Sequence, residues 1–189
     1  MAARKVGKEG RVVGLDFAPQ MIECAKKAVI DSGLQEWDIE LRVVDFGESQ
    51  LPGGCADVVI SNCVINLSPD KDAVYEEVFR ILKHGGRLAI SDIVLNENIE
   101  SQLQERFQLT WAGCLGGAIL EESYWHTMRK AGFTEFQIVS RHTLTPVELK
   151  AMASCPGEEF TPPPNKEDLE IVQGKVDSIK FTAIKLPLV

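Results

Sequence analysis

The sequence predicts an α/β domain with a mostly parallel sheet. Apolar runs rich in β-branched residues alternate with segments of helical periodicity, several of these runs end at a polar residue, and glycine or proline marks the boundaries. The 189 residues suit one globular domain, and neither a linker nor an internal repeat divides them. We therefore expect a single domain over residues 1–189.

The first half of the chain alternates strands with helices. Residues 1–10 fit the end of a helix and a turn. The expected strands are 12–16, 39–44, 57–62 and 88–92, and the expected helices are 19–33 and 69–82. Pro19 suits a first helical turn, Ser68 is a plausible cap for the second helix with Pro69 at its first position, and Gly85-Gly86 ends that helix.

The second half has a weaker pattern. Residues 99–131 are helical in pattern, with a break around 113–117, and residues 133–139 predict a strand. Residues 145–174 are expected to be irregular, and the alternation over 176–184 predicts a closing strand.

Composition excludes several classes of partner. The net charge is −8, with no basic patch, which argues against nucleic acid or an anionic membrane as the main partner. No apolar run approaches the roughly 20 residues needed to span a bilayer. The N-terminus lacks the apolar core of a signal peptide, so a cytoplasmic protein is expected.

The five cysteines form neither a disulfide framework nor a zinc motif. Their number is odd, their spacing is wide and there is no C-x-x-C pair; they are Cys24, Cys55, Cys63, Cys114 and Cys155. In a reducing compartment they are free thiols, available to a soft ligand. Cys24 falls near the apolar face of its helix and is expected in the core, and Cys55 lies in a turn.

Polar residues follow the predicted strands, where ligands bind in open α/β sheets. Cys63 and Asn62 come at the end of the strand that begins near Asp57, although a buried cysteine with no function is an equally open reading from this stretch alone. Asp16 ends an earlier strand and is suited to a ribose diol, because a carboxylate accepts hydrogen bonds from two hydroxyls. Its alternative is a helix cap.

The next strand ends at Asp45-Phe46, which offers an acceptor beside an aromatic face suited to an adenine. A further strand ends at Ser91-Asp92. We expect all four strand ends to open on the same edge of the sheet.

Longer motifs make the chain resemble a class I S-adenosylmethionine-dependent methyltransferase, and within that group an arsenite methyltransferase. The stretches that carry the resemblance are Val12-Val-Gly-Leu-Asp-Phe-Ala-Pro-Gln-Met21, Ser61-Asn-Cys-Val-Ile-Asn-Leu-Ser-Pro-Asp-Lys71, Phe79-Arg-Ile-Leu-Lys-His-Gly-Gly-Arg-Leu-Ala-Ile-Ser-Asp92 and Trp111-Ala-Gly-Cys-Leu-Gly-Gly-Ala118. The resemblance implies a Rossmann-like sheet that is mostly parallel with antiparallel C-terminal strands. Residues 11–92 would be the cofactor side and 93–189 the substrate side.

The same resemblance implies a function and its residues. Cys63 and Cys114 correspond to the arsenic ligands and carry the reaction, and Cys155 is a candidate further thiol. Trivalent arsenic is soft and prefers thiolates. The methyl group would move from S-adenosylmethionine to the arsenic lone pair, a displacement that depends mainly on alignment. The residues expected to bind the cofactor are Asp16, Phe17, Met21, Asp45, Phe46 and Asn62. Expected partners are the trivalent arsenical and a thiol such as glutathione.

One departure from the family's pattern is expected to matter. No Gly-x-Gly loop follows a strand here, so the fold is expected to be N-terminally incomplete, without the family's central first strand and cofactor loop. A truncated gene start, a second copy of the chain or another polypeptide completing the sheet, and direct pairing of the flanking strands are the competing explanations. The alternative functions are a non-catalytic arsenite- or thiol-binding fragment and methylation of a small organic acceptor.

Overall fold

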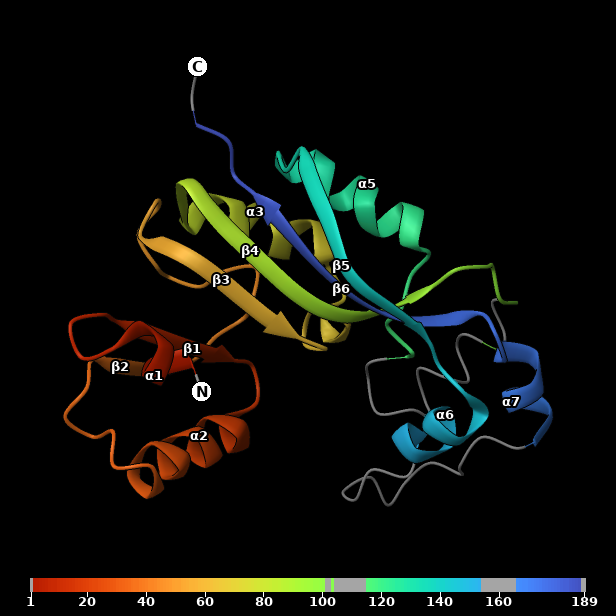
Figure 1. Ribbon diagram of the computed structural model, residues 1–189, viewed down its shortest axis with the longest axis horizontal. Coiled ribbons are helices and arrows are strands. Elements are labelled where there is room, and N and C mark those ends of the chain that lie inside the picture. Colours follow the sequence, from red (N-terminus) through yellow and green to blue (C-terminus); the bar gives the residue numbers. More distant parts are fainter. Residues whose placement is uncertain (1, 101–102, 104–114, 154–165, 188–189) are drawn as a thin grey trace. The chain divides into compact units, whose positions relative to one another are not determined.

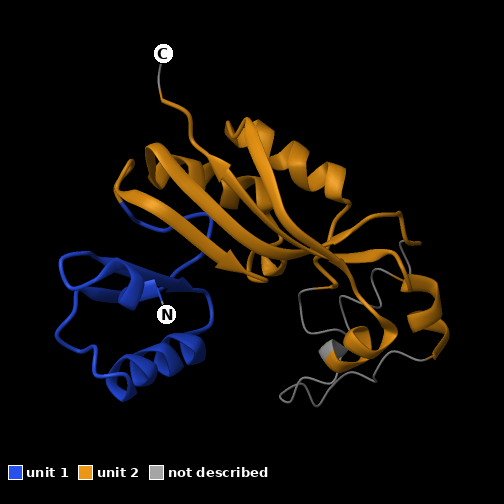
Figure 2. Ribbon diagram, viewed as in Figure 1, with its two compact units in different colours: residues 1–51 blue, residues 52–189 orange. Residues whose placement is uncertain are grey.

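The computed structural model describes residues 2–100, 103, 115–153 and 166–187. Within it the chain divides into two compact units, residues 1–51 and 52–189, which Figure 2 distinguishes by colour. The expectation of a single domain over 1–189 stays a prediction.

The first unit is a helix packed on a pair of parallel strands. It contains α1 (Ala2–Val6), β1 (Val12–Asp16), α2 (Pro19–Asp31) and β2 (Ile39–Val43). Strands β1 and β2 pair in parallel along their whole length. Helix α2 begins with its proline in the first turn, where the missing N–H costs nothing, and packs on both strands. The predicted elements of this part of the chain are confirmed, with boundaries within two residues.

The second unit is built on a mixed sheet with the strand order β3-β4-β6-β5. Its strands are β3 (Ala56–Asn62), β4 (Leu82–Leu95), β5 (Glu135–Thr143) and β6 (Val176–Ile184). The first two pair in parallel, and both pairings of β6 are antiparallel. The predicted fold class, a mostly parallel α/β sheet with antiparallel C-terminal strands, is confirmed.

Five helical segments accompany this sheet in the described residues. They are the 3₁₀ turn η1 (Ile65–Leu67), α3 (Lys71–Ile81), α5 (Glu121–Ala131), α6 (Pro146–Ala153) and α7 (Lys166–Val172). Helices α3 and α5 pack against each other and both contact β4 (Figure 1). The aromatic rings of Tyr75, Tyr124 and Phe181 are fully buried between these helices and the sheet. No helix in the described part of the chain is long and apolar enough to cross a bilayer.

Several predicted boundaries in this unit are wrong. Strand β4 runs to Leu95 rather than ending at Ser91-Asp92. The cap of α3 is Asp70, whose carboxylate accepts a hydrogen bond from the Ala73 N–H, and not Ser68. Strand β5 lies later than residues 133–139.

The region 145–174 is also not irregular throughout, because it contains α6 and α7. Thr145 and Glu148 form a capping box: the Thr145 N–H donates to the Glu148 carboxylate, and the Glu148 N–H donates to the Thr145 hydroxyl. The sequence Thr145-Pro-Val-Glu148 carries this signal.

A buried lysine closes the end of α3. The ammonium of Lys185 donates hydrogen bonds to the carbonyl oxygens of Phe79, at 2.7 Å, and Leu82, at 2.9 Å. It also lies 4.6 Å from the centre of the Phe79 ring. The last carbonyls of a helix lack partners within the helix and carry partial negative charge, so a cation there is favourable.

Replacing Lys185 with methionine should lower the free energy of unfolding by about 1–3 kcal/mol, because two buried carbonyl groups lose their donor. Urea unfolding followed by circular dichroism measures this change. Lys180→Met is the matched control, since Lys180 is exposed on the neighbouring strand β6. Equal losses in both variants would contradict this role for Lys185.

Candidate functional site

Cys63 lies directly beyond the end of β3, as predicted. The last residue pair of the β3–β4 ladder is Asn62 with Ser91, and the Cys63 N–H donates to the Ser91 carbonyl at 2.8 Å. Its backbone has a φ of 56°, the left-handed conformation that non-glycine residues seldom adopt. Such a conformation persists where the surroundings enforce it, and it is often found at functional sites.

The Cys63 side chain is partly buried against the second unit's core. The buried residues of this cluster are Ile93, Leu95, Leu103, Leu115, Ala118, Leu144, Leu149, Val172 and Val176. The structure therefore gives Cys63 an apolar wall together with partial exposure. Asn62, the predicted neighbour in the site, is exposed.

The turn that follows Cys63 is tied to its surroundings by polar groups. The buried Asn66 side chain donates from Nδ2 to the Ile93 carbonyl at 2.7 Å. The Lys71 ammonium donates to the Ser68 carbonyl at 3.2 Å and to the Asn66 carbonyl at 3.4 Å. Burial lowers the pKa of Lys71, and the charge of Asp92 partly opposes this.

Asp92 is fully buried in the strand, not placed at an open strand end as predicted. The error follows from the length of β4, which continues for three residues beyond it. One carboxylate oxygen accepts from the Tyr124 hydroxyl at 2.9 Å and the other from the Ile93 N–H at 2.9 Å. Burial raises the pKa of Asp92 to about 6, although these two hydrogen bonds and Lys71 act in the opposite direction.

A second buried tyrosine, Tyr75, lies close to the Tyr124 hydroxyl that donates to Asp92. Among the described residues no hydrogen bond of normal geometry reaches the Tyr75 hydroxyl, yet the Tyr124 hydroxyl is near enough to lower its pKa slightly. Burial outweighs that effect and raises the pKa of both tyrosines. Neither phenol will therefore ionise near neutral pH. Sequence reasoning missed the interactions of Asp92 with Tyr124 and Lys71, because they join residues that are distant in the chain.

In the first unit, the predicted cofactor residues gather where β1 and β2 end. The Asp16 carboxylate accepts from the Ala18 N–H at 2.9 Å, which uses only part of its capacity. The rings of Phe17 and Phe46 meet edge to face, 5.5 Å between centres. The side chains of Phe17 and Met21 are about half exposed, at 48% and 55%.

Asp45 is exposed next to Phe46, and its side chain accepts from the Gly47 N–H at 2.9 Å. Both predicted carboxylates thus stabilise the turns that follow their strands, and both keep lone pairs for other donors.

Two of the predicted thiols lie outside the described residues, namely Cys114 and Cys155. Cys24, which was expected in the core, is exposed on α2, so that expectation is wrong. It stands at the edge of the helix's apolar face, and that face is narrow, since Ile22 is its one buried residue.

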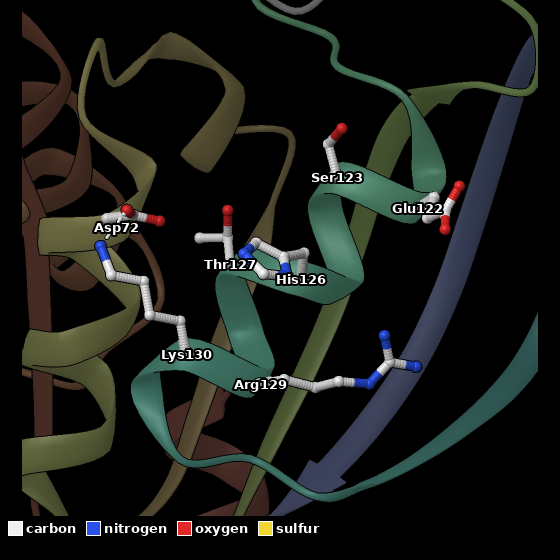
Figure 3. A pocket seen from close by; sticks show the side chains of 7 residues that line it. All are labelled: Asp72, Glu122, Ser123, His126, Thr127, Arg129 and Lys130. Carbon is white, nitrogen blue, oxygen red and sulfur yellow. Dashed lines mark hydrogen bonds and ion pairs between the residues drawn. The ribbon is translucent and has the colours of Figure 1, made fainter.

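A pocket of about 580 Å³ lies along α5 and is a poor candidate for the site (Figure 3). It is lined by Asp72, Glu122, Ser123, His126, Thr127, Arg129 and Lys130. Its cationic Lys130 is already paired with Asp72, and it includes none of the predicted site residues.

The raised pKa of Asp92 predicts how the free energy of unfolding changes with pH. The folded protein holds the Asp92 proton up to about pH 6, whereas the unfolded chain releases it near the usual value of 3.8. Asp92 therefore favours folding at low pH, and this contribution is lost as the pH rises through about 6, a change of about 3 kcal/mol. As the pH rises from 3.8 to about 6, the free energy of unfolding of Asp92→Asn should increase relative to that of wild type.

Urea unfolding at several pH values between about 4 and 7 measures the difference between the two proteins. Asp57→Asn, at an exposed position on β3 where the carboxylate pairs with Lys83 at 2.7 Å, is the control for the loss of a surface carboxylate. Parallel pH profiles for wild type and Asp92→Asn would contradict the assignment.

Comparisons with known proteins identify the family of this chain. Residues 1–132 match the methyltransferase domain family. The chain is 34% identical to an arsenite methyltransferase of Halobacterium salinarum over 77% of this chain and 36% of that protein, and 33% identical to the human arsenite methyltransferase over 74% and 39%.

Among solved structures, an arsenic(III) S-adenosylmethionine methyltransferase from Chlamydomonas reinhardtii superposes with a TM-score of 0.80. Its identity is 27%, and the match covers 98% of this chain and 59% of that one. The chain thus spans well under half the length of the curated relatives it matches. The match over residues 1–132 shows the family: the chain belongs to the methyltransferase domain family.

Proposed function

We propose that the protein of this chain methylates trivalent arsenic held by Cys63 and Cys114, with S-adenosylmethionine as the methyl donor. One observation carries the proposal: Cys63 is held in a left-handed conformation at the carboxyl end of a parallel strand, with its side chain partly exposed on an apolar wall. The similarity to arsenite methyltransferases supports the choice of substrate.

The choice of Cys114 as the second ligand is supported by the residue that follows it in the chain. Leu115 directly follows Cys114 in the chain and is buried in the cluster against which Cys63 packs. Two thiolates would bind a soft trivalent arsenical more tightly than one, and an apolar wall would shield the bonds from water. Cys155 remains a candidate for a further thiol, and a small thiol such as glutathione is the proposed carrier of the arsenical.

The residues of the first unit fit the adenosine part of the cofactor. Asp16 offers carboxylate lone pairs for ribose hydroxyls, and the exposed edge of the Phe17–Phe46 pair offers an aromatic surface for the adenine. The exposed Met21 side chain adds a polarisable apolar contact. Asp45 is suited to accept a hydrogen bond from the base, and Asn62 stays a predicted cofactor residue.

When bound, S-adenosylmethionine supplies an electrophilic methyl group on a sulfonium. The work of the protein is then to hold the arsenic lone pair toward that methyl group and to exclude water. No general base is required, because the arsenic accepts the methyl group through a lone pair it already carries. The absence of an ionisable tyrosine near neutral pH is compatible with this chemistry.

Cys63→Ser and Cys114→Ser should each abolish tight binding of arsenite, since one thiolate of the pair is lost. Calorimetric titration of the reduced chain with arsenite measures this. Cys24→Ser and Cys55→Ser are the controls, because both cysteines are exposed elsewhere. Unchanged binding in either of the first two variants would remove that cysteine from the proposed pair.

Asp16→Asn should weaken binding of S-adenosylmethionine about ten- to hundredfold, because hydrogen bonds from hydroxyl groups to a carboxylate are stronger than those to an amide. The asparagine oxygen can still accept from the Ala18 N–H, so the turn is preserved. Asp31→Asn, at an exposed position at the end of α2, is the control. Binding is followed by calorimetry.

These two binding experiments separate the alternatives. Arsenite binding without cofactor binding would favour a non-catalytic metalloid-binding chain, and cofactor binding without arsenite binding would favour a small organic acceptor. Methylated arsenicals formed from arsenite, glutathione and the cofactor would establish the full activity. A second copy completing the sheet stays a prediction, which sedimentation of the purified chain would test.

A further inference from the structure

The turn between β3 and α3 contains a buried asparagine that the proposed chemistry does not use. Asn66 is 2% exposed and lies within the 3₁₀ turn η1. A buried side-chain amide is costly unless it is hydrogen-bonded, and its Nδ2 donates to the Ile93 carbonyl at 2.7 Å, a short bond in the core. The inference below rests on the proposed function of Cys63 and concerns what holds that thiol.

The bond made by Asn66 continues the pairing of β3 with β4. The ladder's last residue pair is Asn62 with Ser91, after which the Ser91 carbonyl accepts from the Cys63 N–H. Carbonyl groups two residues apart on a strand point the same way, so Ile93 presents the next acceptor on that edge. Beyond Cys63 the main chain no longer pairs with β4, and the Asn66 side chain donates to the Ile93 carbonyl instead.

The two bonds fix both ends of a short segment that contains the thiol. Cys63 is attached to β4 through its own N–H, and three residues later Asn66 is attached to the same strand two residues further on. At the first of these attachments the chain bends, and the backbone of Cys63 is left-handed, with a φ of 56°. Lys71 supports the far end of the turn through the carbonyls of Asn66 and Ser68.

We infer that Asn66 is a positioning residue for Cys63: its side-chain amide replaces a strand N–H on the Ile93 carbonyl and so fixes the direction of the thiol. Without this tether, Cys63 can relax from its left-handed conformation toward the common regions of the backbone map. The thiol then leaves the apolar wall more often, and its geometry for a metalloid or any other ligand is less well defined.

The test is the reactivity of the Cys63 thiol, which does not depend on the identity of the ligand. The reduced full chain is treated with iodoacetamide, and the rate at each cysteine is measured by peptide mass spectrometry, with exposed Cys24 and Cys55 as internal references. Asn66→Ala should raise the rate at Cys63 relative to the references about fivefold, the equivalent of one lost hydrogen bond.

Two further variants make the result specific. Asn66→Leu keeps the approximate size of the side chain but has no donor for the Ile93 carbonyl, so it should act like Asn66→Ala even if truncation prevents folding. Asn96→Ala is the control. At this exposed position Nδ2 donates to the Gly174 carbonyl at 2.9 Å and to the Asp177 carboxylate at 3.2 Å, so the variant loses side-chain amide hydrogen bonds elsewhere and should leave the Cys63 rate unchanged.

Circular dichroism confirms that each variant is folded before the rates are compared. A wild-type rate ratio in folded Asn66→Ala or Asn66→Leu would overturn the inference, as would an equal rise in Asn96→Ala. Arsenite titration of the same proteins distinguishes the positioning role of Asn66 from the proposed binding of arsenite. A raised Cys63 rate in a protein that does not bind arsenite at all supports the positioning role and counts only against the proposed substrate.

Discussion

The parallel pairing of β3 with β4 is the interaction on which the second unit of this protein depends. It ends at Asn62 and Ser91, and the next backbone bond places Cys63 at the carboxyl end of a strand in a left-handed conformation. A parallel ladder fixes the height at which each strand ends, so a residue just beyond it is placed by backbone geometry rather than by its own side chain. The thiol therefore has a defined position before any ligand is present.

The core beneath this pairing holds charged groups, and each is satisfied locally. Asp92 accepts from Tyr124 and from the Ile93 N–H, while Lys185 donates to the last carbonyls of α3. A buried charge is tolerated only where hydrogen bonds replace the lost water, and even then its pKa moves toward the neutral form, as that of Asp92 does. These bonds join α3, α5 and the sheet through directional contacts as well as through apolar packing.

The order of the strands and the main helices was predictable because their signals are local. Buried strands appear as short β-branched runs, and Pro19 marks the start of α2 in the sequence itself. The place of Cys63 after β3 was predictable for the same reason. The extent of β4 was not, because its extra residues are held by pairing with β6, which is distant in the sequence. Helix α6 was missed although its capping box, Thr145 with Glu148, is a local signal.

By itself, the sequence determined the fold class, the candidate thiol Cys63 and the group of Asp16, Phe17 and Phe46 at the end of β1 and β2. The fold class and the polar strand ends follow from residue type and short-range pattern, whereas the choice of Phe17 and of Cys63 as a site residue came from the resemblance to a methyltransferase family. Only the tertiary structure decided that the Asp92 carboxylate is buried, with the Tyr124 hydroxyl as its donor and the Lys71 charge nearby. It also decided that the Asn66 side chain donates to the Ile93 carbonyl. The physical reason is that hydrogen bonds and burial depend on which elements meet, and no spacing along the chain contains that information.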